Sequence, residues 1–173
     1  MFTIRRAVPS DAALLGTIGP AAYAESYGDW WQTLAAYYAF LSTFSTQAFM
    51  TMLAQPEIRV WIAEADHGPA GFLTMRLGVA DPVTDQLGGA EIPKFYLLGL
   101  SRGMGIGRAL IDVAIAEAQS EGATYLWLEA MAEASWARRA YEEWGFAKIG
   151  AVALDNGLKP DRAIKLIMRR TLP

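Results

Sequence analysis

The chain of 173 residues contains no cysteine and only one histidine, His67. The absence of cysteine excludes disulfide bonds, thiolate zinc sites and cysteine nucleophiles. His67 lies in the turn-like stretch "DHG", and no second ligand at metal spacing accompanies it. No metal site is therefore expected.

The chain also lacks a large excess of charge of either sign, and it has no long apolar run. The formal net charge is −3, so the chain lacks the broad basic surface that binds nucleic acid, and no nucleic-acid partner is expected. The longest apolar run, residues 34–41, is too short to cross a bilayer, so no membrane association is expected. Arg5 and Arg6 precede "AVPSDA" rather than an apolar segment. A secretory signal is therefore not expected, and we expect a cytoplasmic location.

The remaining composition is that of a globular domain. Hydrophobic residues make up 53% of the chain, and aromatic residues 12%. A chain of this length can bury about two-thirds of its unfolded surface, so residues 1–173 are expected to form one domain.

The pattern of apolar residues predicts an α/β protein with one mixed sheet and helices packed on it. Strands are expected at 2–8, 59–65, 69–79, 90–100, 123–130, 146–154 and 162–170. Helices are expected at 10–27 (disturbed near Gly16, Gly19 and Pro20), at 29–41, from Ser45 or Thr46 to before Pro56, at 105–121 and at 133–144. Pro93 indicates a bulge or an edge position within its strand.

The stretch "GLSRGMGIGRAL", residues 99–110, admits three interpretations. Gly99-x-Ser101-x-Gly103 matches a serine-hydrolase motif, but that motif needs a downstream histidine, and His67 lies upstream. A dinucleotide-binding loop would need glycine where Arg108 stands. Glu129, at the end of the next strand, occupies the place of a ribose-binding acid, so this second interpretation stays open.

The third interpretation needs only backbone groups. Glycines at 103, 105 and 107 let successive N–H groups converge at the start of a helix, where the helix dipole favours a pyrophosphate. Arg102 and Arg108 could add charge-assisted contacts to phosphates. The alternative is an ordinary glycine-rich loop that leads into a helix.

With "WLEA" at 127–130 and "ARRAYEEWGF" at 137–146, the chain resembles the GNAT superfamily of N-acetyltransferases. Arg102-x-x-Gly105-x-Gly107 is similar to the family motif that wraps the pyrophosphate of acetyl-CoA. The resemblance is good over residues 60–150. It implies a GNAT-like fold, with a mostly antiparallel sheet splayed between the fourth and fifth strands, and transfer of an acetyl group from acetyl-CoA to a primary amine.

The resemblance also implies residue roles. Glu129 is the expected general base, and Tyr141 the expected general acid. Backbone at 95–97 would pair with pantetheine, and an N–H near Leu97 would polarise the thioester carbonyl. Ala134 stands where the family often has an asparagine that contacts the cofactor, which puts that contact in doubt. The expected cofactor-binding residues are Phe95, Tyr96, Leu97, Arg102, Gly103, Met104, Gly105, Ile106, Gly107, Arg108 and Ala134.

The acceptor is expected against the aromatic residues of 23–49, with Glu25, Tyr27 and Trp30 as its binding residues. Aromatic faces and a carboxylate suit a cation, and both chain ends loosely resemble bacterial spermidine/spermine acetyltransferases. A polyamine-like amine is therefore favoured. The alternatives are a protein N-terminus or lysine as acceptor, and a non-catalytic acyl-CoA sensor. A homodimer is plausible because many relatives pair.

Overall fold

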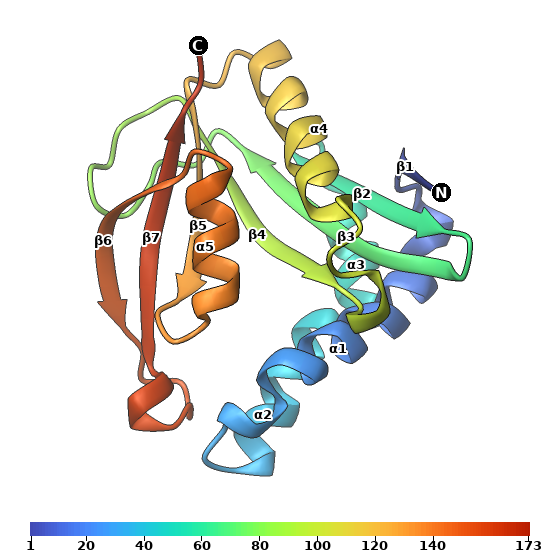
Figure 1. Ribbon diagram of the computed structural model, residues 1–173, viewed down its shortest axis with the longest axis vertical. Coiled ribbons are helices and arrows are strands. Elements are labelled where there is room, and N and C mark those ends of the chain that lie inside the picture. The colour runs from blue at the N-terminus through green and yellow to red at the C-terminus, as the bar shows by residue number, and fades with distance from the viewer.

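The structure, a computed structural model, describes all 173 residues and contains one seven-stranded sheet of order β1-β2-β3-β4-β5-β7-β6 (Figure 1). Every neighbouring pair is antiparallel except β4 and β5, which are parallel. This confirms the predicted mostly antiparallel sheet. The strands are β1 Phe2–Arg6, β2 Ile58–Ala65, β3 Gly68–Leu77, β4 Gly89–Leu97, β5 Tyr125–Met131, β6 Ala147–Ala153 and β7 Ile164–Thr171.

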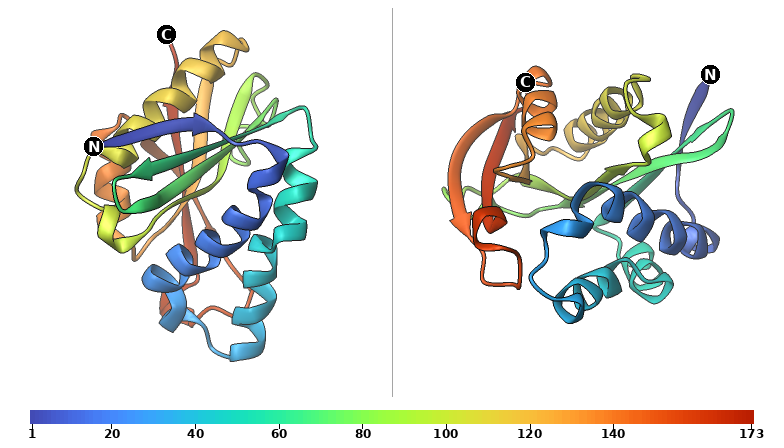
Figure 2. Two further views of the ribbon diagram at one scale, coloured as in Figure 1. Left: turned by 90° about the vertical axis from the view of Figure 1, so that its right-hand side faces the viewer. Right: turned by 60° about the horizontal axis from the view of Figure 1, so that its bottom comes forward.

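Helices cover both faces of the sheet, with α1, α2 and α3 on one side and α4 and α5 on the other (Figure 2). Alternate side chains of β2 point to opposite faces of the sheet. Val60 and Ile62 pack with the residues of α1 and α3, whereas Trp61 and Ala63 pack with those of α4. Burial on both faces explains the continuous apolar runs of the central strands. The helices are α1 Ala12–Tyr27, α2 Leu34–Leu41, α3 Thr46–Leu53, α4 Ile106–Ser120 and α5 Ser135–Glu143. None of them combines the length and apolar character that crossing a membrane requires.

The first helix is continuous, which corrects the predicted disturbance near Gly16, Gly19 and Pro20. A Cβ atom added to Gly16 would lie 2.6 Å from Oγ1 of Thr46, at the start of α3. The glycine therefore allows α1 and α3 to approach closely. This packing keeps α1 helical, although its glycines and proline favour a break in the helix.

Residues 29–41 do not form the single helix that the sequence predicted. Gly28–Trp30 is a 3₁₀ turn, and Trp31 is extended and forms an isolated β-bridge with Leu158. Helix α2 begins only after Thr33, whose side chain accepts a hydrogen bond from the Ala36 N–H. The bridge is a contact between distant parts of the chain, so local periodicity could not reveal it.

The sheet opens into a V between β4 and β5. The two strands pair only from Gly89 opposite Tyr125 to Ile92 opposite Leu128, and the next residue, Pro93, has no N–H to continue the ladder. Beside Pro93 the register with β3 also shifts. Of the two alternatives predicted for Pro93, the bulge is confirmed; β4 itself is an interior strand of the sheet, between β3 and β5.

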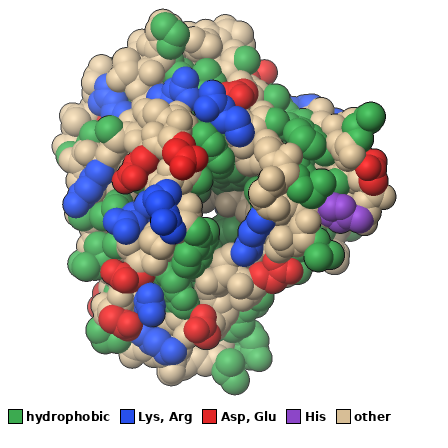
Figure 3. Space-filling view, viewed as in Figure 1, with side chains coloured by type: hydrophobic (Ala, Val, Ile, Leu, Met, Phe, Trp, Pro, Cys, Tyr) green, Lys and Arg blue, Asp and Glu red, His purple; other side chains and the backbone are tan.

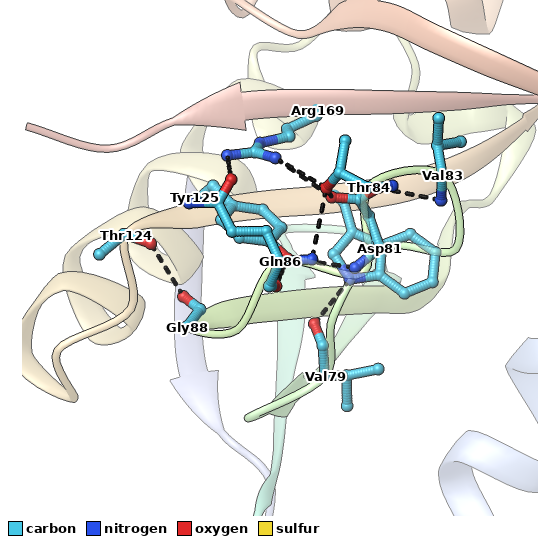
Figure 4. A network of polar contacts seen from close by, with 10 residues as sticks. Val79, Asp81, Val83, Thr84, Gln86, Gly88, Thr124, Tyr125 and Arg169 are labelled. Atoms are coloured by element: carbon cyan, nitrogen blue, oxygen red, sulfur yellow. Dashed lines mark hydrogen bonds and ion pairs between the residues drawn. The ribbon is translucent and has the colours of Figure 1, made fainter.

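A polar network holds the closed end of the V (Figure 4). Asp81, which is fully buried, accepts hydrogen bonds from Thr84 Oγ1 at 2.6 Å and from Arg169 Nη1 at 3.2 Å. The Asp81 N–H donates to the Tyr125 hydroxyl at 3.1 Å, and the Arg169 guanidinium lies 3.7 Å above the Tyr125 ring. These contacts tie the loop before β4 to β5 and β7, so the strands stay together at this end.

Candidate active site

Two adjoining cavities occupy the open part of the V. The β5 cavity, about 240 Å³, lies between β4, β5 and the N-terminal helices, and the α4 cavity, about 430 Å³, lies between β4, the start of α4 and α5. Figure 3 shows the hollow between the two sides of the molecule, with hydrophobic side chains inside it and Lys and Arg side chains at its margin. The cavities share the lining residues Tyr27, Phe95, Tyr96, Ala137 and Tyr141.

The glycine-rich loop forms one wall of the α4 cavity. Gly105 is the N-cap of α4 and has φ +81°, a conformation that favours glycine. A Cβ atom there would meet nothing within 4 Å, so the space in front of the loop is open. At Gly107 a Cβ atom would lie 2.9 Å from the Trp144 ring, so this glycine permits close packing. Unpaired N–H groups at the start of a 15-residue helix suit a phosphate group.

The two arginines of the loop line the same cavity, and both have partners within the protein. Arg102 Nη2 donates to Ser26 Oγ at 2.8 Å and lies 3.7 Å from Glu25 Oε2, which ties the loop to α1. Arg108 Nε donates to Asp112 at 2.9 Å within α4. These pairs hold two positive charges at the margin of the cavity.

One face of α5 forms the opposite wall of the α4 cavity. Five residues that recur at helical spacing in the sequence line it: Trp136, Ala137, Ala140, Tyr141 and Trp144. Trp136 and Trp144 were not predicted as site residues, although their spacing placed them beside Tyr141.

The backbone of β4 faces the groove with alternate groups. The N–H groups of Lys94 and Leu98 are directed toward β3, to Thr74 Oγ1 and to the Ala70 carbonyl, each at 3.0 Å. Because adjacent N–H groups point to opposite sides of a strand, those of Phe95 and Leu97 point into the V. The structure therefore presents free backbone donors where the sequence expected them.

Tyr141 lies at the junction of the two cavities and lines both. Burial, and to a smaller extent the neighbouring Tyr27, raises the pKa of Tyr141 above its usual value. Burial also raises the pKa of Tyr27 to about 12, although the Arg102 charge opposes this shift. Both phenols are thus protonated at neutral pH and can donate a proton or a hydrogen bond.

Glu129 lines the β5 cavity together with Lys165 of β7. Lys165 stands opposite Met131, two residues along β5 from Glu129, so the two side chains are diagonal neighbours on adjacent strands. Lys165 Nζ lies 2.5 Å from Glu129 Oε2, and the Glu129 side chain remains 35% exposed. The carboxylate is therefore paired and still accessible from the cavity.

A second lysine in the β5 cavity was missed by the sequence analysis. Lys94 Nζ donates to Thr43 Oγ1 at 3.1 Å and lies 3.8 Å from the centre of the Phe44 ring. Burial lowers the pKa of Lys94 to about 8, and the charge of Lys165 contributes in the same direction. Lys94, Thr43 and Lys165 lie on three separate segments, so no local motif could have grouped them.

Two of the predicted acceptor-binding residues do not line the β5 cavity. Glu25 Oε2 accepts a hydrogen bond from the Gly99 N–H at 2.6 Å. Trp30 is only 6% exposed and packs against the Arg162 guanidinium, 4.9 Å from its ring. Of the predicted three, only Tyr27 lines the cavity. Other aromatic residues of the N-terminal region line it with Tyr27, namely Tyr23, Trp31 and Phe40.

Three of the predicted cofactor-binding residues lie outside the lining of the α4 cavity. Met104 is exposed at the surface. Ile106 and Ala134 have side chains fully buried in the two hydrophobic cores. The other eight predicted residues line the cavity: Phe95, Tyr96, Leu97, Arg102, Gly103, Gly105, Gly107 and Arg108.

Ser101 and His67 are close in space, which their order in the sequence did not suggest. His67 Nε2 lies 3.0 Å from Ser101 Oγ. Ser101 is fully buried, whereas the nucleophile of a hydrolase must be accessible to substrate. The contact therefore joins the β2–β3 turn to the loop before α4 and does not restore the hydrolase interpretation.

Comparison with known proteins assigns the family. Residues 22–146, most of the chain, match the acetyltransferase (GNAT) family. The chain belongs to the GNAT family. It is therefore an acetyl-CoA-dependent N-acetyltransferase with acetyl-CoA as co-substrate.

Solved structures of several GNAT acetyltransferases are similar to this chain, whereas no curated protein matches it. PaiA N-acetyltransferase from Thermoplasma acidophilum, in complex with coenzyme A, has a TM-score of 0.78 and 17% identity over 99% of each chain. A putative phosphinothricin N-acetyltransferase has a TM-score of 0.74 and 20% identity over 100% of this chain and 99% of its own. The ribosomal-protein-S18-alanine N-acetyltransferase from Escherichia coli has a TM-score of 0.66 and 20% identity over 99% of this chain and 94% of its own. These likenesses show the fold, and they do not support a special closeness to polyamine acetyltransferases.

Proposed function

We propose that this GNAT enzyme acetylates the primary amine of a small molecule bound in the β5 cavity. The observation that carries the proposal is a set of contacts across the open end of the V. Trp31 and Leu158 form a β-bridge, and the Gln32 N–H donates to the Gly157 carbonyl at 2.9 Å. These contacts join the segment between β6 and β7 to the residues before α2, and Figure 1 shows this segment near the N-terminal helices. Asn156 and Leu158 of the same segment line the β5 cavity. A groove bridged in this way suits a small molecule better than an extended peptide.

The residues of the α4 cavity fit acetyl-CoA, which supplies the acetyl group as an activated thioester. The N–H groups at the start of α4, with the open space in front of Gly105, would hold its pyrophosphate. The backbone of residues 95–97 would hold pantetheine. In this arrangement the Leu97 N–H would donate a hydrogen bond to the thioester carbonyl and would stabilise the negative charge that develops on its oxygen.

Glu129 is the proposed general base. A primary alkylamine has a pKa near about 10, like that of lysine, so most of it is protonated at neutral pH and must lose a proton before attack. Lys165 occupies Oε2 of Glu129, which leaves Oε1 for the amine or for a bridging water.

Tyr141 is the proposed general acid. Its place at the junction of the cavities lies between the expected thioester and the expected amine. Its raised pKa keeps the hydroxyl protonated until the CoA thiolate departs, when the proton can pass to sulfur.

An acetyl-CoA thiol-release assay with small amines and short peptides tests this function. Release that depends on small amines is the expected result. Release with peptides alone would replace the small acceptor with a protein. No release with any acceptor, together with stabilisation by acetyl-CoA, would indicate an acyl-CoA sensor.

Three further expectations remain predictions: the single domain over 1–173, the cytoplasmic location and the homodimer. Light scattering would test the homodimer.

A further inference from the structure

Three charged side chains line the β5 cavity, and one positive charge among them has no partner. The three residues are Lys94, Lys165 and Glu129. Lys165 and Glu129 form an ion pair, so they largely neutralise each other. Lys94 has no carboxylate partner; its ammonium contacts the Thr43 hydroxyl and the face of the Phe44 ring.

The surroundings of Lys94 penalise its charge. The side chain is half-buried among aromatic rings, and this burial lowers its pKa to about 8, with a further contribution from Lys165. A hydroxyl and a ring face compensate an ammonium less well than an ionised oxygen does. An anion beside Lys94 would therefore form a charge-assisted hydrogen bond and relieve the repulsion between the two lysines.

Lys94 lines the β5 cavity but not the α4 cavity, which contains the glycine loop. Tyr27, Phe95 and Tyr141 line both cavities, whereas Lys94 and Lys165 line only the β5 cavity. An acceptor with its amine at the junction, next to Tyr141, would place the rest of its structure toward the lysines.

We propose that the acceptor is a small amine that also carries an acid group, a carboxylate or a phosphorus oxyacid, and that Lys94 binds this group. The inference rests on the proposed function and specifies its substrate class. It departs from the polyamine expectation because Glu25, the carboxylate expected to attract a cation, is bound to the Gly99 N–H and does not line the cavity. The additional ammonium groups of a polyamine would meet the unpaired charge of Lys94 instead.

Matched pairs of amines test the proposal on the intact protein. Each of several α- and ω-amino acids, and an aminoalkylphosphonate, is compared with the amine of the same chain that lacks the acid group, and putrescine and spermidine complete the panel. Thiol release from acetyl-CoA yields kcat/KM for each. We expect the acid-bearing member of the preferred pair to exceed its neutral partner at least tenfold, and to exceed both polyamines.

Variants of Lys94 connect this preference to the residue. Lys94→Met keeps an apolar stem between the rings and removes the charge, so it should lower the ratio of acidic to neutral kcat/KM at least tenfold. Lys94→Arg retains the charge and should keep most of the preference. Lys148→Gln, at an exposed position of β6, is the control and should leave both rates unchanged. Stabilisation by acetyl-CoA verifies that each variant is folded.

The outcomes separate this inference from the proposed function. Preference for neutral amines or polyamines, or a ratio that Lys94→Met leaves unchanged, would overturn the acid-bearing acceptor while acetyl transfer to a small amine stands. Transfer to none of the amines would overturn both.

Discussion

Glu129 is the side chain whose role the pH dependence of the reaction can test. Replacing it with glutamine keeps the shape and removes the base, so we expect the rate at neutral pH to fall about 10²-fold. Raising the pH should partly restore the rate, because more of the amine is then deprotonated without help. Steady-state rates between pH 7 and 10 measure this effect. Glu142→Gln, an exposed change on α5, is the control; a pH profile of Glu129→Gln parallel to that of the wild type would eliminate Glu129 as the base.

Removing the hydroxyl oxygen of Tyr141 distinguishes a role in proton transfer from a role in cofactor binding. Tyr141→Phe should lower kcat about 10²-fold, because no phenol remains to protonate the leaving thiolate. The Kd for acetyl-CoA, measured by calorimetry, should change by no more than a few-fold, because the ring still lines both cavities. Tyr38→Phe, at an exposed tyrosine of α2, is the matched control. A large loss of acetyl-CoA affinity would make Tyr141 a cofactor contact instead.

The segment between β6 and β7 can be detached from the N-terminal helices at Gly157. This glycine has φ +86°, and a Cβ atom would lie 2.5 Å from Cβ of Ala36. Gly157→Ala should therefore displace the segment and raise the KM for the acceptor about tenfold, while acetyl-CoA affinity stays within a few-fold, because the segment does not line the α4 cavity.

Gly122→Ala is the matched control for this change. Gly122, after α4, also has a positive φ of 78°, but a Cβ atom there meets nothing within 4 Å. Both variants carry the cost of a left-handed conformation, about 1 kcal/mol, and only Gly157→Ala adds the clash. An acceptor KM that rises equally in both variants would show that general destabilisation, and not the bridge, is responsible.

The loop that closes the V depends on Asp81. Burial alone would raise the pKa of Asp81, but its hydrogen bonds from Thr84 and Val83 and the Arg169 charge outweigh burial and lower it. Its pKa in the folded protein is thus below that in the unfolded chain. The carboxylate contributes stability above the unfolded pKa, and this contribution is lost as the pH falls through the folded pKa.

Asp81→Asn should lower the free energy of unfolding at pH 7 by about 3 kcal/mol, because Arg169 loses its buried partner. It should also reduce the loss of stability below about pH 4. Denaturant unfolding at several pH values measures both effects. Asp85→Asn in the same loop has an exposed side chain and should change neither. Equal stability of Asp81→Asn and wild type at pH 7 would show that the network does not hold the closed end of the V.

Acetyl-CoA should stabilise the molecule as a whole, because the α4 cavity is lined by α1, β4, α4 and α5 together. At 100 times its Kd it should add about 2.7 kcal/mol to the free energy of unfolding, provided that it binds only the folded chain. Unfolding with acetyl-CoA, with NAD and without ligand measures this, and NAD is expected to have no effect. An equal shift with NAD would return the glycine stretch to the dinucleotide interpretation.

The opening of the sheet between β4 and β5 was expected from the family resemblance. The sequence by itself determined the order of the elements, the irregularity at Pro93, the glycine loop and the face of α5 that lines the α4 cavity. These features follow from local chemistry: a missing N–H, positive φ angles and helical spacing. Glu129 and Tyr141 were predicted as site residues because each lies in a stretch that resembles a family motif, and their roles stay predictions. Local patterns also misled where packing opposed them, as at Gly16 and Gly19 in α1.

Only the tertiary structure decided which charges face the acceptor. Lys94 and Lys165 are 71 positions apart in the printed chain, and they line one cavity because β4 and β7 lie on opposite sides of β5. Glu25 turned instead to the Gly99 N–H, a partner that no local pattern names. The charge of a cavity depends on contacts between distant segments and on the burial that they cause, and these arise only when the chain has folded.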